Sequence, residues 1–373
     1  MNPASAIETP HPAGANGRHS GIEALRLVSM FLILSLHVNF YAFGRPSPTA
    51  FDMCFSASLT RVFCESFAIV GVNTFVLISG WFGIRPKAKG VLSLLFQCAF
   101  FCCVIYAAGW VGGMDFSRRD ALKYLFFLGK TNWFIKSYLA LYILAPVLEA
   151  FAASAGKHLF GTVVFSFFVF QTLYGWLCPA ADYFSNGYSV VSFFGLYLLA
   201  RYIRVWKPQF ASKGPTFDMI AYAVFSAFSA LLCMLSVFGI LPDRIRVFAY
   251  CSPFVVLSSL FLFLFFSKLP GTSRFVNEVA RSSYAIYLFH THPCVLRPLL
   301  IPAIVWLCPP TSSTSCRALG GLLAIAVLLF GVAVIAILLD RLRIVLWNSM
   351  WTVVECRIEE CQKRNQSTSL KGC

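Results

Sequence analysis

The chain has 373 residues, of which 58% are hydrophobic and only 12% are charged, and its mean hydropathy is +0.74. Its 39 phenylalanines exceed what the core of one soluble domain buries. Most of the formal net charge of +15 lies between apolar runs, where basic side chains face anionic lipid headgroups or a cytosolic anion. The composition therefore excludes a soluble nucleic-acid-binding protein and indicates a membrane protein.

Charge-free apolar runs recur along the chain, and runs of about 18 or more residues are typical of transmembrane helices. The clearest run lies between Arg317 and Asp340. The pattern predicts an all-α fold, a polytopic transmembrane helical bundle of about ten spans. The expected spans are residues 22–43, 64–83, 90–112, 132–152, 158–178, 187–206, 216–238, 247–267, 276–304 and 318–339.

Polar segments flank the apolar region at both ends. Residues 1–20 are expected to form a disordered cytoplasmic lead. The first apolar run lacks a small-residue cleavage signature, which favours a retained helix over a signal peptide. Residues 346–373 turn polar again and are expected to form a short cytoplasmic tail. The residues between these two segments, 21–345, are expected to form a single transmembrane domain.

The lysines and arginines predict how the spans are oriented, because they concentrate in cytoplasmic connections. If the spans alternate from a cytoplasmic N-terminus, most of these residues fall on the cytoplasmic side. The connection at 113–131 fits this arrangement least well, since it places four basic residues on the outer side. We therefore expect both termini to be cytoplasmic.

The first expected span carries two ionisable side chains, Arg26 and His37, that are costly inside a membrane. His37 follows Arg26 by eleven positions, so both lie on one helix face, about 16 Å apart along the axis. Such a polar stripe is expected to face the bundle interior or a wet cavity, where ionisable residues are functional by default. The alternative is that Arg26 reaches the cytoplasmic headgroups and His37 hydrogen-bonds a neighbouring helix.

Several apolar segments share short patterns of polar and small residues. They are "GIEALRLVSMFLILSLH" (21–37), "GVNTFVLISGWF" (71–82), "NWFIKSYLALYILAPVLEAF" (132–151), "FFGLYLLARYIRVW" (193–206) and "SSYAIYLFHTHP" (282–293). In this order they resemble helices of the membrane-bound acyltransferase 3 family, whose first helix has an arginine and a histidine separated by ten residues. The resemblance covers about residues 20–345, with Ala200 where glycine is common.

The resemblance implies transfer of an acyl group, usually acetyl from acetyl-CoA in the cytosol, to a hydroxyl group. The acceptor would be a surface glycan, a lipid-linked saccharide or a similar exported molecule, so the activity would be O-acetylation in polysaccharide modification. Some members carry a C-terminal extracytoplasmic hydrolase-like domain, whereas we expect this chain to be the stand-alone form. The resemblance further implies a multi-pass protein of the plasma (inner) membrane that contacts membrane lipids and no nucleic acid.

The resemblance places the chemistry on the first helix. His37 is expected to act as the general base on the acceptor hydroxyl or as a transient acyl carrier. Arg26, the other expected catalytic residue, would contact the anionic part of CoA. Further contacts to the CoA phosphates would come from Arg85, Lys87, Lys89, Arg201 and Arg204, although basic residues at this end of the helices are also typical of positive-inside topology.

Other polar residues in the spans are candidates for acceptor binding, and no metal site is expected. They are Glu23, Ser79, Trp133, Lys136, Tyr138 and His290. Structural alternatives stay open, because small residues such as Ser79 favour close helix packing. Trp133 and Tyr138 are also typical interfacial anchors. His290, close to His292 and Pro293, would equally suit a capped structural pair.

Two other classes of protein remain open. A transporter or flippase of a glycan or lipid-linked intermediate would also have many spans and few buried charges. Such a protein typically has two related halves with broken helices, and the sequence has no such symmetry. A non-catalytic membrane scaffold gives no reason for Arg26 and His37 to share a helix face.

Overall fold

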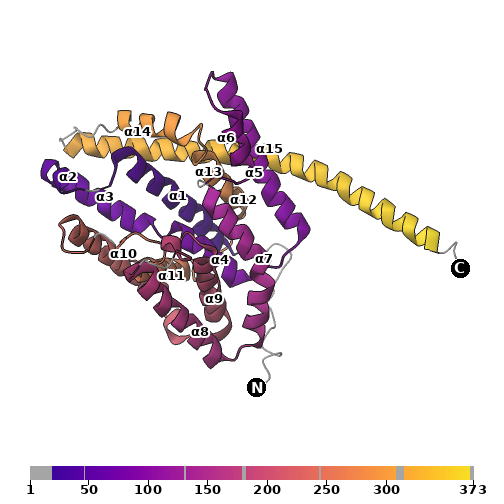
Figure 1. The fold of residues 1–373 in the computed structure, drawn as a ribbon, viewed down its shortest axis with the longest axis horizontal. Coiled ribbons are helices and arrows are strands. Elements are labelled where there is room, and N and C mark those ends of the chain that lie inside the picture. Colours follow the sequence, from indigo (N-terminus) through magenta and orange to yellow (C-terminus); the bar gives the residue numbers. More distant parts are fainter. Residues whose placement is uncertain are drawn as a thin grey trace.

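The computed structural model describes residues 19–45, 47–129, 132–178, 182–242, 245–307 and 315–369. Within these ranges the chain is helical and contains no strand, which confirms the all-α prediction. Of the predicted lead, residues 1–18 lie outside the described residues, and Ser20 already begins the first helix. Figure 1 shows the helices packed into one bundle, beyond which the C-terminal part of the last helix projects.

The first half of the chain forms eight α-helices within the described residues. They are α1 (Ser20–Phe43), α2 (Pro48–Met53), α3 (Phe55–Ala68), α4 (Gly71–Phe82), α5 (Ala88–Val111), α6 (Arg118–Leu125), α7 (Trp133–Ser154) and α8 (Lys157–Phe170). The second half adds α9 (Val190–Trp206), α10 (Pro215–Val237), α11 (Pro253–Ser267), α12 (Arg274–Ala280), α13 (Ser283–His290), α14 (Ile301–Leu307) and α15 (Ser315–Ser369). Short π-helical or 3₁₀ turns are η3 (Gln171–Leu177), η4 (Ser185–Gly187), η5 (Gln209–Ser212) and η6 (Leu296–Leu300).

Seven helical segments of the described chain are long and apolar enough to cross a membrane. They are residues 20–39, 55–82, 88–111, 133–154, 157–177, 215–237 and 323–358. Helices α9 and α11, at two further expected spans, have 17 and 15 residues. The protein is therefore a multi-pass helical membrane protein. The count of about ten spans and the cytoplasmic termini stay predictions.

The expected span at 276–304 is divided in the structure into α12, α13, η6 and α14. Pro293 and Pro298 explain the irregular stretch after α13, because proline lacks the amide hydrogen that continues a helix. His290 ends α13, and His292 lies two residues beyond it. Both histidines are fully buried, so the break in the helix places two imidazole rings inside the bundle.

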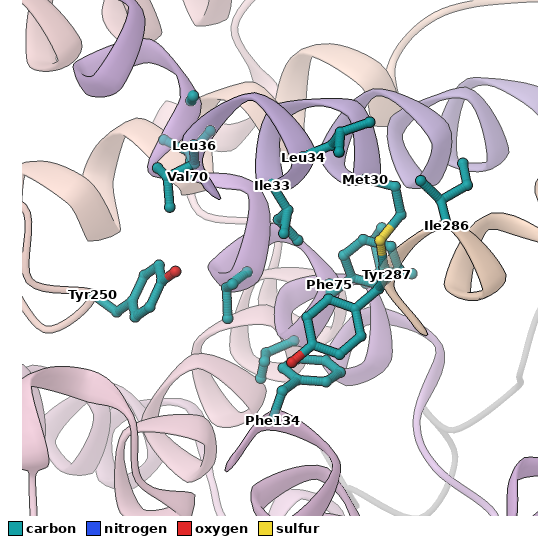
Figure 2. Close-up of a cluster of buried hydrophobic side chains, with 14 of the residues drawn as sticks. Met30, Ile33, Leu34, Leu36, Val70, Phe75, Phe134, Tyr250, Ile286 and Tyr287 are labelled. Atoms are coloured by element: carbon teal, nitrogen blue, oxygen red, sulfur yellow. The ribbon is translucent and has the colours of Figure 1, made fainter. Parts of the chain in front are cut away.

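Helix α1 lies at the centre and packs against α3, α4 and α11 to α15. In Figure 2 its Met30 and Ile33 lie among side chains of other helices, including Phe75 and Phe134. Two glycines let the backbone of α4 approach its neighbours closely. A Cβ on Gly71 would lie 2.8 Å from the Ser29 carbonyl oxygen of α1, and one on Gly80 2.8 Å from Cα of Tyr197 in α9. Small residues thus hold α1, α4 and α9 together.

The last helix, α15, continues past the expected end of the transmembrane domain. It runs without interruption to Ser369, so the described part of the predicted tail at 346–373 is helical. Residues 370–373 lie outside the described residues. Tryptophans 347 and 351 on this extension stack with ring centroids 5.3 Å apart, and the side chain of Lys89 lies over the second ring, 5.0 Å from its centroid. The extension therefore contacts the start of α5.

Candidate active site

A pair of histidines from two helices forms the centre of the candidate site. Nδ1 of His37 in α1 lies 2.9 Å from Nε2 of His290 in α13, and the ring centroids are 5.2 Å apart. His290 is fully buried and His37 is half-buried. The sequence suggested both residues as candidates, but it did not indicate that they touch across 253 positions.

A backbone carbonyl determines which nitrogens of the pair carry hydrogen. Nδ1 of His290 lies 2.6 Å from the carbonyl oxygen of Ile286, and a carbonyl only accepts hydrogen bonds. In the neutral ring, Nδ1 of His290 therefore carries the hydrogen and Nε2 accepts. Nδ1 of His37 must then donate to that nitrogen. The lone pair of a neutral His37 is consequently on Nε2.

A cavity of about 560 Å³ opens at the N-terminal end of α1. We call it the basic cavity, because its lining holds four basic side chains and one acidic residue, Glu23. The basic residues are Arg26, Lys89, Arg281 and Arg343. Ser79 and Tyr138 also line it, and their hydroxyl oxygens are 3.2 Å apart. Among the sequence candidates, the structure thus places Glu23, Arg26, Ser79, Lys89 and Tyr138 around one space.

Two of these arginines differ in how they are bound. Both carboxylate oxygens of Asp340 accept hydrogen bonds from Arg343, at 2.8 and 2.9 Å, and Gln97 donates to the same carboxylate. Nε of Arg26 is buried and has no hydrogen-bond partner among the described residues, with the Glu23 carboxylate 3.6 Å away. Because buried donors are normally paired, Arg26 is suited to receive an anion.

A layer of aromatic rings lies between the basic cavity and the histidine pair. Phe134, Tyr138 and Tyr284 line the cavity. Tyr287 stacks on Tyr284 with centroids 5.7 Å apart and contacts Phe134 at the same distance. It also meets His290 edge-on at 6.0 Å. Figure 2 shows Phe134 and Tyr287 close together. These rings therefore connect the lining of the basic cavity to the histidine pair.

The remaining basic candidates lie outside the lining of the basic cavity. Arg201 donates to the carboxylate of Glu149 at 2.8 Å, and the guanidinium of Arg204 lies over the Trp81 ring, 4.7 Å from its centroid. Arg85 is exposed. The two acceptor candidates at the start of α7 are also elsewhere. Trp133 stacks on Tyr250, and exposed Lys136 donates to the carbonyl of Gly129.

Two basic residues of the cavity were not singled out from the sequence. Arg281 immediately precedes the "SSYAIYLFHTHP" segment, and Arg343 follows the charge-free run between Arg317 and Asp340. Both resemble ordinary positive-inside residues at helix ends, whereas Lys89 was among the basic candidates of the sequence. A weak signal did exist for Arg343, because its spacing from Asp340 allows an i, i+3 ion pair.

The model of one protein family matches the chain. It describes the acyltransferase domain of the acyltransferase 3 family and matches residues 19–341. No curated protein and no solved structure matches the chain. The matched region contains α1 with Arg26 and His37, and α13 with His290. The resemblance seen in the sequence is thereby confirmed, and the chain belongs to the acyltransferase 3 family of membrane acyltransferases.

Proposed function

We propose that the protein transfers acetyl from acetyl-CoA to a hydroxyl of a surface glycan, a lipid-linked saccharide or a similar exported acceptor in the plasma membrane. The observation that carries this proposal is the position of the His37–His290 pair behind the basic cavity, on the same helix as Arg26. A histidine suits the activation of a hydroxyl, which is a poor nucleophile at neutral pH.

The basic cavity fits the chemistry of acetyl-CoA. Its phosphates would be held by the basic side chains of the lining, since guanidinium and ammonium groups form strong charge-assisted hydrogen bonds to phosphate oxygens. Trp347, also in the lining, offers an aromatic face for the adenine ring. The apolar pantetheine arm would pack on the layer of Tyr284 and Tyr287. Its thioester would then reach His37, about 16 Å from Arg26 along α1.

Nε2 of His37 is the proposed base. As the acceptor oxygen attacks the thioester carbonyl, this nitrogen takes the hydroxyl proton. The carbon–sulfur bond then breaks, the ester forms, and the proton is passed to the CoA thiolate. In the alternative two-step route, the same nitrogen attacks the thioester, the carbon–sulfur bond breaks and the CoA thiolate leaves. The acceptor hydroxyl then displaces the imidazole from the acyl group, and its proton passes to the thiolate. Both routes require the tautomer that His290 favours.

A transfer assay tests the proposal. Purified protein in detergent receives acetyl-CoA labelled in the acetyl group, with and without extracted membrane glycans. We expect acceptor-dependent movement of the label from CoA to glycan hydroxyls as a base-labile ester. If the label stays on CoA while glycan moves across proteoliposomes, the transporter or flippase alternative is correct instead.

A further inference from the structure

A second cavity, of about 740 Å³, lies at the other end of the helices that form the basic cavity. Its walls come from the C-terminal end of α5, the segment containing α6, and the chain just after α13. Its lining includes Tyr106, Asp115, Asp120, Lys123, Tyr124 and Cys294. From the sequence, Lys123 was noted only as a basic residue of the 113–131 connection. The sequence indicated no function for the other residues of this lining.

The histidine pair lies between the two cavities. Helix α5 contributes Gln97 to the basic cavity and Tyr106 to the second one, and these residues are about 14 Å apart along the helix. The α13 segment contributes Tyr284 to the basic cavity and Cys294 to the second one. His290 stands between those two positions.

His292 is a buried hydrogen-bond donor beside the second cavity. Its Nδ1 accepts from the backbone N–H of Cys294 at 3.2 Å, so Nε2 carries the hydrogen in the neutral ring. This Nε2 is fully buried and has no hydrogen-bond partner in the described part of the chain. An unpaired buried donor is costly. It therefore indicates a group that binds here.

The walls around His292 have the chemistry of a saccharide site. The rings of Tyr106 and Tyr124 meet its imidazole edge-on, at 4.5 and 4.8 Å, and both line the cavity. Burial raises the pKa of Tyr124 above its usual range, so its hydroxyl stays a neutral donor. Aromatic faces pack on the apolar faces of sugar rings, and carboxylates such as Asp120 accept from sugar hydroxyls.

The charge of the second cavity does not suit CoA. Among the described residues of its lining, the charged side chains are the two carboxylates of Asp115 and Asp120 and the ammonium of Lys123. That ammonium lies 3.7 Å from the Asp120 carboxylate. Fixed negative charge repels phosphates and tolerates a neutral polyhydroxyl ligand. The two cavities therefore differ in the sign of charge that they favour.

We propose that the second cavity binds the acceptor as a neutral saccharide ring, with Nε2–H of His292 donating to one of its oxygens. The acceptor hydroxyl then reaches His37 from the end opposite to acetyl-CoA. This inference rests on the proposed function, because an acceptor site has meaning only if the protein transfers an acyl group. It adds where the acceptor binds and which side chains recognise it.

Octyl β-D-glucoside is a suitable probe, used with protein in a sugar-free detergent. Its binding is measured by calorimetry, and acetyl transfer to it is measured with labelled acetyl-CoA. In Asp120→Ala we expect the Kd and the acceptor KM to rise about tenfold, the worth of one lost hydrogen bond to a charged group. The KM for acetyl-CoA should stay within about twofold. The matched control is Asp52→Ala, an exposed acid of α2 outside this cavity, and it should change neither value.

A second variant separates recognition from folding. His292→Gln keeps a donor and should therefore retain more glucoside affinity than His292→Leu. Acetyl-CoA should stabilise both variants equally against heat, which shows that both are folded. Glucoside binding that ignores both Asp120 and His292 overturns the proposal, even if acetyl is transferred. If the wild type binds glucoside through these residues but never receives acetyl, the acyl transfer of the proposed function fails while the saccharide site stands.

Discussion

His37 and His290 are joined by a hydrogen bond of 2.9 Å between α1 and α13, and the second ring is anchored to the Ile286 carbonyl. This chain of donors and acceptors leaves the basic nitrogen of His37 on the side away from His290. In serine hydrolases a carboxylate holds the catalytic histidine in its working tautomer. Here a neutral histidine would take that role, which avoids a charge inside the membrane.

The first prediction concerns His290 as a positioning residue. His290→Leu removes the acceptor for Nδ1–H of His37, so we expect kcat to fall roughly 10²-fold or more, as when a base adopts the wrong tautomer. His290→Gln keeps an acceptor oxygen and should recover a large part of the rate. Steady-state kinetics with acetyl-CoA check both variants. An equal loss in Leu and Gln would show that His290 serves packing alone.

Much of this site was accessible from the sequence because it depends on the geometry of one helix. The spacing of Arg26 and His37 predicts a shared face, and the apolar runs predict a helical membrane protein. The partners of α1 were not accessible, because they come from positions far along the chain. Only the packing of α13 and α15 on α1 brings His290 and Arg343 to the same site.

The basic candidates illustrate the same limit. Arg201 and Arg343 both lie near ends of apolar segments and look alike in sequence. In the structure Arg201 binds Glu149, whereas Arg343 lines the basic cavity. Which cationic residues share a cavity depends on how the helices are rotated and packed, and no local spacing encodes that.

The second prediction concerns stability. Asp340 is fully buried and holds Arg343, which is 6% exposed. Asp340→Ala leaves that guanidinium without its counter-charge, and breaking a buried pair in this way costs about 3–5 kcal/mol. We expect a clear fall in the Tm of the purified protein. Asp52→Ala, which removes an exposed acid, should leave the Tm unchanged.

The third prediction concerns orientation. Because lysines and arginines concentrate in cytoplasmic connections, reporter fusions after residue 20 and after residue 345 should both give cytoplasmic signals. A fusion near Ser312 should give an outer signal. Signals on opposite sides for the two ends would mean that the number of spans is odd.

The fourth prediction concerns the donor. Arg26→Ala removes a half-buried cation of the basic cavity, so the KM for acetyl-CoA should rise about tenfold or more, the worth of a charge-assisted hydrogen bond. Excess acetyl-CoA should restore part of the rate. The thermal stabilisation of the protein by acetyl-CoA should weaken in parallel.

A control for this variant is Arg274→Ala, an exposed arginine at the start of α12 outside the cavity lining. Arg274→Ala changes the net charge by the same amount as Arg26→Ala. If the effect of Arg26 on acetyl-CoA binding is local, the control variant should show no rise in KM. A similar loss in both variants would instead indicate general attraction of an anion to a basic surface.

The last prediction separates His37 from Arg26. His37→Asn keeps polarity and approximate size but cannot take a proton at neutral pH. We expect transfer to fall roughly 10²–10⁴-fold, the usual worth of general-base catalysis. Binding of acetyl-CoA should stay nearly intact, because the phosphates are held at the far end of α1. Single-turnover kinetics and thermal shifts with acetyl-CoA measure the two effects separately. Near wild-type transfer by folded His37→Asn would make His37 a structural residue, and the base would then have to be sought at His290.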